Sequence, residues 1–357
     1  MDPDFPPPTL LAADVRKRFS DALRNFDAQK PVLVMGHHDA DGLSATALLV
    51  RALRSSGREV ITRIVGRGEN PWSKSMAAEL EPLALAGLMV ADLGVRPGTI
   101  KSDAPTIIID HHVPSTALAD GAVISGYGHS PVPTSSLLAF WCASEIADAD
   151  RWLWIAAIGL IGDMAEGADF PELSLARKRY GITALREATT LINAPRRSAS
   201  GDASPALHLL LHAESPKDLL SGRYPETAKL QAAREEVKAA MAGARRIAPK
   251  VRNGVALILF DSPCQIHPLI AQQWRGRLKN EIVLAANTGY RPGWIHFAAR
   301  SARDVDLIEF LAEHKPAGAD ENYGSGHVAA TGGALRPDDW NAFIVGLGFG
   351  PESQVQP

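Results

Sequence analysis

The sequence predicts an α/β protein. Its larger, N-terminal part is expected to be a doubly wound, mainly parallel sheet, and its smaller, C-terminal part a second α/β domain. Two observations carry this prediction. Short apolar runs in the first half alternate with segments of helical spacing, and strands that are apolar throughout are typical of parallel sheets covered on both faces. The same alternation begins again after a long charged helical segment in the second half.

The N-terminal part is expected to contain four strands with helices between and after them. Apolar runs of strand length, bounded by glycine or proline, predict strands at 31–35, 59–65, 88–91 and 105–109. Apolar residues at helical spacing predict helices at 43–54, 76–86, 134–147, 152–162 and 172–192. Parallel strands need such crossover connections, so the two sets of elements are consistent with each other.

The chain is expected to fold as two domains, 1–195 and 226–357, joined by a loop and linker region at 196–225. Residues 195–205 are rich in Ser, Arg, Gly and Pro, which is typical of an exposed loop. The alanine-rich, charged pattern at 225–248 predicts a long helix, which could connect the domains or pair with a copy of itself in a homodimer. Strands at 255–260, 281–286 and 294–300, with helices among them, predict a smaller unit of mixed strand direction.

Composition narrows the class of protein. The 357 residues are 46% apolar and 22% charged, which is ordinary globular usage. No segment resembles a signal peptide, and no apolar run approaches the ~20 residues of a membrane span. A cytoplasmic protein without a membrane partner is therefore expected. The net charge of −3 lacks the basic excess of proteins that bind long nucleic acids, so a short anionic substrate is favoured.

Metal-ligating side chains occur at four places that the predicted sheet should bring to one edge, because ligands bind outside the carboxyl ends of parallel strands. These places are His37-His38-Asp39-Ala40-Asp41-Gly42, Asp92, Asp110-His111-His112 and Gly162-Asp163. Carboxylates and imidazoles together suit Mn²⁺ or Mg²⁺. There are enough of them for two ions, which would activate water and offset the charge of an attacked phosphate. The sequence thus indicates a two-metal hydrolase.

Each aspartate also has an ordinary structural interpretation. A single aspartate after a strand usually caps a helix or forms a turn, and Asp39 or Asp41 could cap the helix expected near Leu43. Paired histidines at a strand end are harder to explain in this way. The arrival of all four places at one edge favours a metal site.

At these residues the sequence resembles the DHH phosphoesterase superfamily. The triplet Asp110-His111-His112 follows an isoleucine strand, and residues 37–42 are similar to the RecJ-type form of the opening motif. Asp92 and Gly162-Asp163 fit two further motifs. The C-terminal part resembles the DHH-associated domain through Gly324-Ser325-Gly326-His327 and a strand containing Arg300. The resemblance covers roughly residues 30–347.

The resemblance implies a role for each matching residue. The metal ligands would be His37, Asp39, Asp41, Asp92, His111 and Asp163, holding two ions, Mn²⁺ first and Mg²⁺ as the alternative. Asp92 would bridge the ions, Asp110 would orient its neighbours, and His112 would stabilise charge or donate a proton, with His111 completing the catalytic triplet. Substrate would be held by Arg300, Gly324, Ser325, Gly326 and His327. Ser325 stands where the family usually has the middle one of three glycines.

The resemblance also implies hydrolysis of phosphodiester bonds, with single-stranded nucleic acid as the partner. Short oligonucleotides or dinucleotides are favoured as substrates, because the chain is slightly acidic and a processive nuclease needs a long grip on its strand. One alternative is a RecJ-like 5'→3' exonuclease on single-stranded DNA, and another is a 3',5'-bisphosphonucleotide phosphatase. A non-catalytic nucleic-acid-binding scaffold is the last alternative; such a relative should have lost ligands that are all present here.

Overall fold

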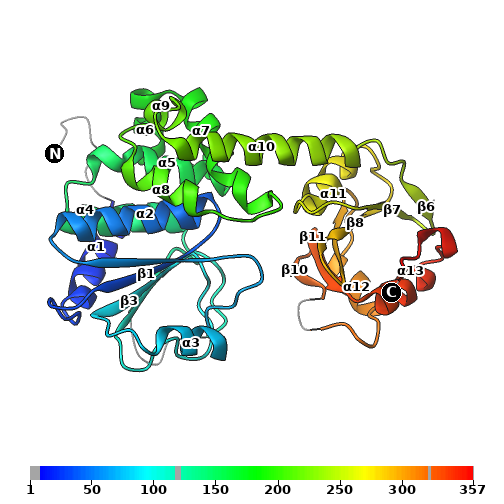
Figure 1. Ribbon diagram of the computed structural model, residues 1–357, viewed down its shortest axis with the longest axis horizontal. Coiled ribbons are helices and arrows are strands. Elements are labelled where there is room, and N and C mark those ends of the chain that lie inside the picture. The colour runs from blue at the N-terminus through cyan, green and yellow to red at the C-terminus, as the bar shows by residue number, and fades with distance from the viewer. Residues whose placement is uncertain (1–8, 117–121, 321–322, 357) are drawn as a thin grey trace. The chain divides into compact units, whose positions relative to one another are not determined.

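A computed structural model describes residues 9–116, 122–320 and 323–356, which divide into two units (Figure 1). The first unit contains Met1–Arg196 and Gly201–Ala232, and the second contains Arg197–Ser200 and Ala233–Pro357. The predicted α/β class is confirmed, because each unit has a sheet with helices packed against it.

The sheet of the first unit has five strands in its described residues, and every neighbouring pair is parallel. The strands are β1 (Val32–His37), β2 (Val60–Val65), β3 (Gly87–Ala91), β4 (Thr106–Asp110) and β5 (Ala122–Ser125). Their order is β2-β1-β3-β4-β5. β2 therefore lies on one side of β1, and β3, β4 and β5 follow on the other side. Sheets of this kind bind ligands where the direction of strand addition changes, which here is between β1 and β3.

Side chains of β1 alternate between two cores, as the period of a strand requires. Val32 and Val34 pack into the larger core with α1 (Leu10–Leu23), α2 (Ala40–Ser55) and α4 (Ser135–Ile146). Leu33 and Met35 pack into a smaller core with α3 (Lys74–Leu80). Helices thus cover both faces of the sheet, which confirms the doubly wound prediction (Figure 1).

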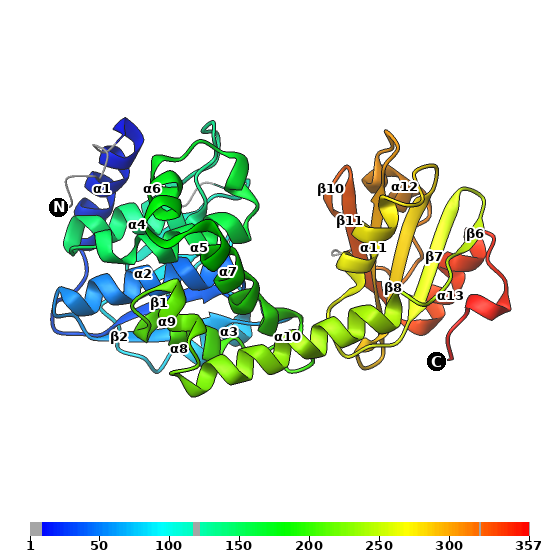
Figure 2. The same ribbon diagram turned by 90° about the horizontal axis from the view of Figure 1, so that it is seen from above.

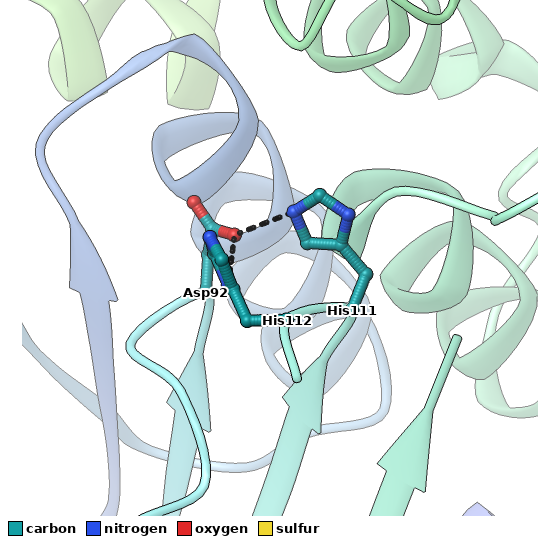
Figure 3. Close-up of side chains that lie close together, drawn as sticks. All are labelled: Asp92, His111 and His112. Carbon is teal, nitrogen blue, oxygen red and sulfur yellow. Dashed lines mark ion pairs between the residues drawn. The ribbon is translucent and has the colours of Figure 1, made fainter. Parts of the chain in front are cut away.

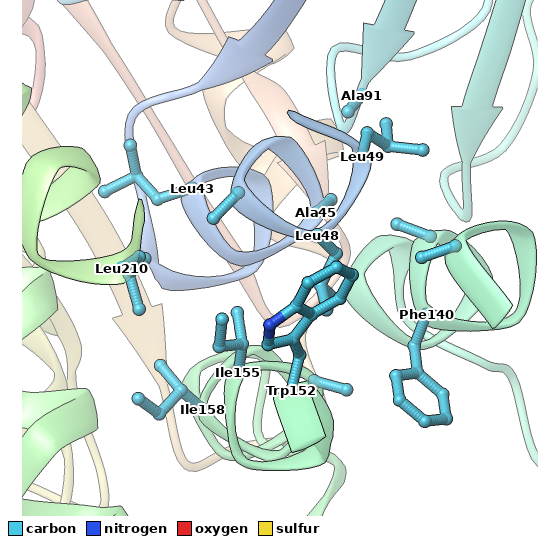
Figure 4. Packing of buried hydrophobic residues seen from close by; sticks show 14 of the residues in the cluster. Leu43, Ala45, Leu48, Leu49, Ala91, Phe140, Trp152, Ile155, Ile158 and Leu210 are labelled. Carbon is cyan, nitrogen blue, oxygen red and sulfur yellow. The ribbon is translucent and has the colours of Figure 1, made fainter. Parts of the chain in front are cut away.

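The larger core continues into a helical layer beyond α2. Here α5 (Leu153–Gly162) buries nearly its whole length, and Figure 4 shows Leu48 of α2 together with Trp152 and Ile155 in this packing. The single helix expected at 172–192 is instead two helices, α6 (Pro171–Tyr180) and α7 (Ile182–Arg197). Gly181 separates them with φ of 79°, a conformation that glycine adopts without strain.

Three helices lie where the sequence predicted none. Thr9 caps α1, and this helix buries Phe19 in the larger core. The region 196–225, expected as loop and linker, contains α8 (Ser204–His212) and α9 (Pro216–Leu220). Leu209 and Leu219 of these helices pack into the larger core. Helices this short are defined by the surface on which they pack, not by a long periodic pattern.

The main segment of the second unit begins within α10 (Pro225–Ala244). Its sheet has six strands in the described residues, in the order β10-β11-β9-β8-β7-β6. The strands are β6 (Lys250–Arg252), β7 (Val255–Phe260), β8 (Ile282–Arg291), β9 (Trp294–Ser301), β10 (Ser325–His327) and β11 (Ala330–Leu335). Only β7 and β8 run parallel, so the expected mixed direction is confirmed.

Helices cover both faces of this sheet as well (Figure 2). One core contains residues of α12 (Leu307–Glu313) and α13 (Pro337–Gly346). The other contains residues of α11 (His267–Arg275) and of the end of α10. Short 3₁₀ segments lie at Asp150–Trp152, Ala165–Gly167 and Pro351–Ser353. In the described part of the chain, no helix has both the length and the apolar character needed to cross a membrane.

Candidate functional site

The metal-ligating side chains predicted in the N-terminal part meet at the carboxyl edge of the five-stranded sheet. All except Asp163, which follows helix α5 (Leu153–Gly162), lie within a few residues of the ends of β1, β3 and β4. Figure 3 shows three of them, Asp92, His111 and His112, side by side at the strand ends. Because β1, β3 and β4 are neighbours in the sheet, their carboxyl ends bring together residues that lie far apart in the sequence.

The turn between β1 and α2 contributes His37 and Asp39. The helix begins at Ala40, earlier than the expected start near Leu43, because Asp39 is its N-cap and accepts a hydrogen bond from the Gly42 N–H at 3.1 Å. The capping oxygen is Oδ1, while Oδ2 lies 3.1 Å from Nδ1 of His37. Asp39 therefore caps the helix with one oxygen and still presents the other to the site.

Glycine is required at Gly42 because the turn is closely packed. A Cβ atom at Gly42 would lie 2.6 Å from Cβ of His37 and 2.7 Å from its carbonyl oxygen. Any larger residue would therefore displace His37, which is a candidate ligand.

The helix α4 holds Asp41 in a fixed orientation. Asp41 is buried, and its two oxygens accept hydrogen bonds from the first N–H groups of the helix, Ser135 to Oδ2 at 2.9 Å and Ser136 to Oδ1 at 3.0 Å. These N–H groups have no partner inside their own helix, and the helix N-terminus favours negative charge. The sequence analysis did not assign either serine to the site. The only signal was the polar run Thr134-Ser135-Ser136 at the start of an otherwise apolar helix.

Asp92 lies at the centre of the site. Its Oδ2 is 3.5 Å from Nδ1 of His37. Its Oδ1 is 3.5 Å from Nε2 of His111 and 3.9 Å from Nδ1 of His112, the two contacts drawn in Figure 3. Asp92 has φ of 62°, the left-handed region that few residues other than glycine adopt, and such strain is common at functional sites. Two groups of side chains close enough to hold an ion share this residue: His37, Asp39 and Asp92, and Asp92, His111 and His112.

Asp110 is buried beneath the site and belongs to neither of these groups. Its Oδ2 accepts a hydrogen bond from the Gly94 N–H at 2.7 Å, and its Oδ1 accepts one from the His112 N–H at 2.7 Å. The same Oδ1 is 3.1 Å from Nδ1 of His112. This hydrogen bond, with the charge of Asp110, outweighs the effect of burial and raises the pKa of His112 to about 9.

His111 lies between three carboxylates. Its Nε2 is 3.5 Å from Asp92 and 3.9 Å from Asp41, and its Nδ1 is 3.6 Å from Oδ2 of Asp163, the residue that ends α5. Nε2 is buried and has no hydrogen-bond partner among the described residues. A buried ring nitrogen without a partner is unusual unless an absent group binds it.

The electrostatics of the site suit the binding of a divalent cation. Burial raises the pKa of Asp92, and the negative charge of Asp41 adds to the effect. Burial and the charge of Asp41 likewise raise the pKa of Asp163 to about 6. Burial alone would lower the pKa of His37, but its contacts with Asp39 and Asp92 outweigh this and raise that pKa to about 9. Crowded carboxylates around a buried imidazole nitrogen fit a divalent ion, and the two groups that share Asp92 give room for two.

His38, the second histidine of the opening motif, points away from this centre. Its Nδ1 is 3.1 Å from the carbonyl oxygen of Val65, and burial lowers its pKa to about 4. It thus links the turn after β1 to the end of β2.

The predicted substrate residues belong to the sheet of the second unit. Arg300, on β9, donates hydrogen bonds from Nη1 to the carbonyl oxygens of Ala299 and Thr331. Gly324 has φ of 75° and donates its N–H to Gly332 at 2.9 Å. The backbone of Ser325, Gly326 and His327 forms β10, which is separated from β9 by the single strand β11. The side chains of these three residues lie outside the described part of the structure.

Part of the chain matches a known protein family. Residues 31–160 match the family model described as "DHH family, N-terminal domain". The single-stranded-DNA-specific exonuclease RecJ of Thermus thermophilus is 28% identical over 268 residues, which are 65% of this chain and 40% of that protein. The chain thus spans less than half the length of this curated relative.

Two solved structures share the fold. A crystal structure of exonuclease RecJ bound to manganese gives a TM-score of 0.67 at 21% identity, covering 98% of this chain and 97% of that one. RecJ of Thermus thermophilus in complex with Mn²⁺ gives a TM-score of 0.66 at 19% identity, covering 99% of this chain and 57% of that one. At these identities the likeness is one of fold.

Proposed function

Since the chain belongs to the DHH phosphoesterase superfamily, we propose that it is a divalent-metal-dependent hydrolase of phosphodiester bonds. The observation that carries the proposal is the shared position of Asp92, whose two carboxylate oxygens face two groups of potential ligands. Two-metal sites that hydrolyse phosphate esters use such a shared carboxylate.

The ligands proposed for the two ions are those expected from the sequence. His37, Asp39 and Asp92 would serve one ion, and Asp92 and His111 the other, with Asp41 and Asp163 close to His111. Mn²⁺ is the proposed metal, because it accepts both imidazole and carboxylate ligands; Mg²⁺, which prefers oxygen, is the alternative. When bound, the ions would activate water and offset the negative charge of the attacked phosphate.

The chain's own residues supply orientation and a proton. Asp110 accepts a hydrogen bond from the backbone N–H of His112, and the same oxygen lies 3.1 Å from Nδ1 of the ring. These two contacts hold the imidazole in one orientation. His112 is half exposed, and with a pKa of about 9 it carries a proton at neutral pH. Nδ1 faces Asp110, so Nε2 is the atom that can give a proton to the leaving oxygen or stabilise charge on the phosphate.

The proposed substrate is single-stranded nucleic acid, with short oligonucleotides or dinucleotides preferred and nucleoside monophosphates as products. The net charge of −3 supports short substrates, because long strands are bound mainly by an excess of basic residues. Arg300 and the backbone of 324–327 are proposed to bind the substrate's phosphate and base. Cytoplasmic location and homodimerisation stay predictions from the sequence.

A second candidate function is 5'→3' exonuclease activity on longer single-stranded DNA. The observation that favours it is the curated relative, which is specific for single-stranded DNA and matches 65% of this chain.

Product analysis separates these functions. The protein is incubated with Mn²⁺, with Mg²⁺ or without metal, and with end-labelled RNA and DNA from dinucleotides through about five to about 25 nucleotides. A 3',5'-bisphosphonucleotide is included. We expect metal-dependent cleavage that is fastest on the shortest strands. Fast degradation of the long DNA from its 5' end would support the second candidate instead.

A variant with both Asp110 and His111 replaced by alanine tests whether the chain is an enzyme at all. The proposal expects this variant to lose turnover. A non-catalytic scaffold would show no metal-dependent cleavage even as wild type, and its affinity for nucleic acid would survive the two substitutions.

A further inference from the structure

Ser135 touches two of the proposed metal ligands through two different atoms. Its backbone N–H donates to Oδ2 of Asp41 at 2.9 Å, and its hydroxyl Oγ donates to Oδ1 of Asp92 at 2.9 Å. The residue is the first of α4 and is fully buried. It is therefore held by the helix and by the core, and its hydroxyl cannot exchange Asp92 for a water partner at the surface.

The Ser135 contact distinguishes the two oxygens of Asp92. Oδ1, which accepts the hydroxyl, faces Nε2 of His111 at 3.5 Å, while Oδ2 faces Nδ1 of His37 at 3.5 Å. The 2.9 Å contact with Ser135 is the shorter of the two that Oδ1 makes with Ser135 and His111. The last torsion of an aspartate side chain has no sharp preference, so the orientation of its carboxylate is decided by such contacts.

We propose that Ser135 is a positioning residue that fixes the plane of the Asp92 carboxylate, so that one oxygen serves each of the two ligand groups. This inference rests on the proposed metal-dependent function and names a residue that acts through a ligand. Without the hydroxyl, Oδ1 loses its donor and the carboxylate can rotate away from His111. The ion held with His111 then binds more weakly, while the ion held with His37 and Asp39 keeps Oδ2.

Ser144 provides a control on the same helix. Its hydroxyl donates a hydrogen bond to the carbonyl oxygen of Phe140 at 2.8 Å, within α4. The neighbouring Ser136 is unsuitable as a control, because its side chain interacts with Asp41, itself a proposed ligand. Ser135→Ala and Ser144→Ala each remove one hydroxyl from α4 and preserve both backbone hydrogen bonds to Asp41.

The test is a calorimetric titration of the metal-free, full-length variants with Mn²⁺, supported by electron paramagnetic resonance of the bound ions. In wild type we expect two ions coupled through the shared carboxylate. Ser135→Ala should lose about 10-fold in affinity for one ion and weaken the coupling, as loss of an outer contact to a ligand usually does. Ser144→Ala should bind both ions as wild type does, because its hydroxyl bonds the carbonyl oxygen of Phe140.

A second pair of variants controls for folding. Ser135→Thr retains the hydroxyl, and Ser135→Val has the same shape without it, so only the threonine variant should restore wild-type affinity and coupling. Equal binding by these two variants, or by Ser135→Ala and Ser144→Ala, would overturn the inference. Wild-type protein that binds no Mn²⁺ would instead overturn the proposed function itself, so the two failures are distinguishable.

Discussion

The guanidinium of Arg196 donates a hydrogen bond from Nη1 to Oδ2 of Asp39 at 2.7 Å, linking the last turn of α7 to the N-cap of α2. Both side chains are mostly buried, with exposed fractions of 25% and 20%. A second contact supports the link, because Oδ1 of Asn193 accepts the Ala40 N–H at 2.9 Å. The end of α7 thus braces the turn that carries the first candidate ligands.

Arg196→Ala should lower the free energy of unfolding of the metal-free protein by about 1–3 kcal/mol, since it removes a charge-assisted hydrogen bond from a partly buried carboxylate. Denaturant unfolding without metal measures the change. Arg186→Ala is the control, because Arg186 lies on the same helix and pairs with Glu166 but is 60% exposed. Its removal should cost less than about 0.5 kcal/mol, and equal losses in the two variants would contradict the bracing role.

Asp92→Asn should abolish metal-dependent hydrolysis without unfolding the protein. Asparagine tolerates the left-handed backbone of this position, but it is a far weaker ligand, so activity should fall at least about 100-fold. Burial and the charge of Asp41 raise the pKa of Asp92 in the folded, metal-free protein. The free energy of unfolding therefore falls as pH rises and Asp92 ionises. The metal-free variant should therefore melt no lower than wild type at neutral pH, and added Mn²⁺ should raise its melting temperature less.

Metal binding should release a proton from His37. Its pKa of about 9 means that the metal-free protein carries this proton at neutral pH, whereas a ligating imidazole must be neutral. Apparent affinity for Mn²⁺ should therefore rise as pH rises toward 9. The stability of the metal-free protein should change in the opposite direction and fall as pH rises. The contribution of protonated His37 to stability is complete below the unfolded pKa of 6.5 and is lost as pH rises through about 9.

Calorimetry in buffers of different ionisation enthalpy measures this release. His37→Gln should reduce the number of protons released at neutral pH. His38→Gln is the matched control, because burial lowers the pKa of His38 to about 4 and leaves it without a proton to release. Unchanged proton release in His37→Gln would show that the proton comes from elsewhere.

Gly42→Ala should destabilise the first unit by about 1–3 kcal/mol, because the new Cβ would lie 2.6 Å from Cβ of His37. The displaced histidine should also weaken Mn²⁺ binding. Gly167→Ala is the control in the same unit, since a Cβ there meets nothing within 4 Å. Thermal unfolding with and without Mn²⁺ compares the two variants. Equal melting temperatures, and an equal rise with Mn²⁺, would show that the turn accommodates a Cβ at position 42.

The sequence by itself determined the α/β class and the parallel direction of the strands in the main sheet. Strands such as Ile107–Ile109 are apolar on both faces, and only a sheet covered on both faces buries them. The short strand β5 and the helices α1, α8 and α9 were beyond its reach. Their few apolar residues gain stability only from the surface on which they pack, which is assembled by distant parts of the chain.

The sequence also determined which residue types arrive at one edge of that sheet, because strand ends are local features. Only the tertiary structure decided their roles relative to one another. In the folded protein Asp92 belongs to two groups of potential ligands, and Asp110 bonds Gly94 and His112. Ser135 there bonds Asp41, and Arg196 bonds Asp39. The last two hydrogen bonds join residues 94 and 157 positions apart. No local pattern encodes such contacts, since they depend on how helices pack after the strands have formed the sheet.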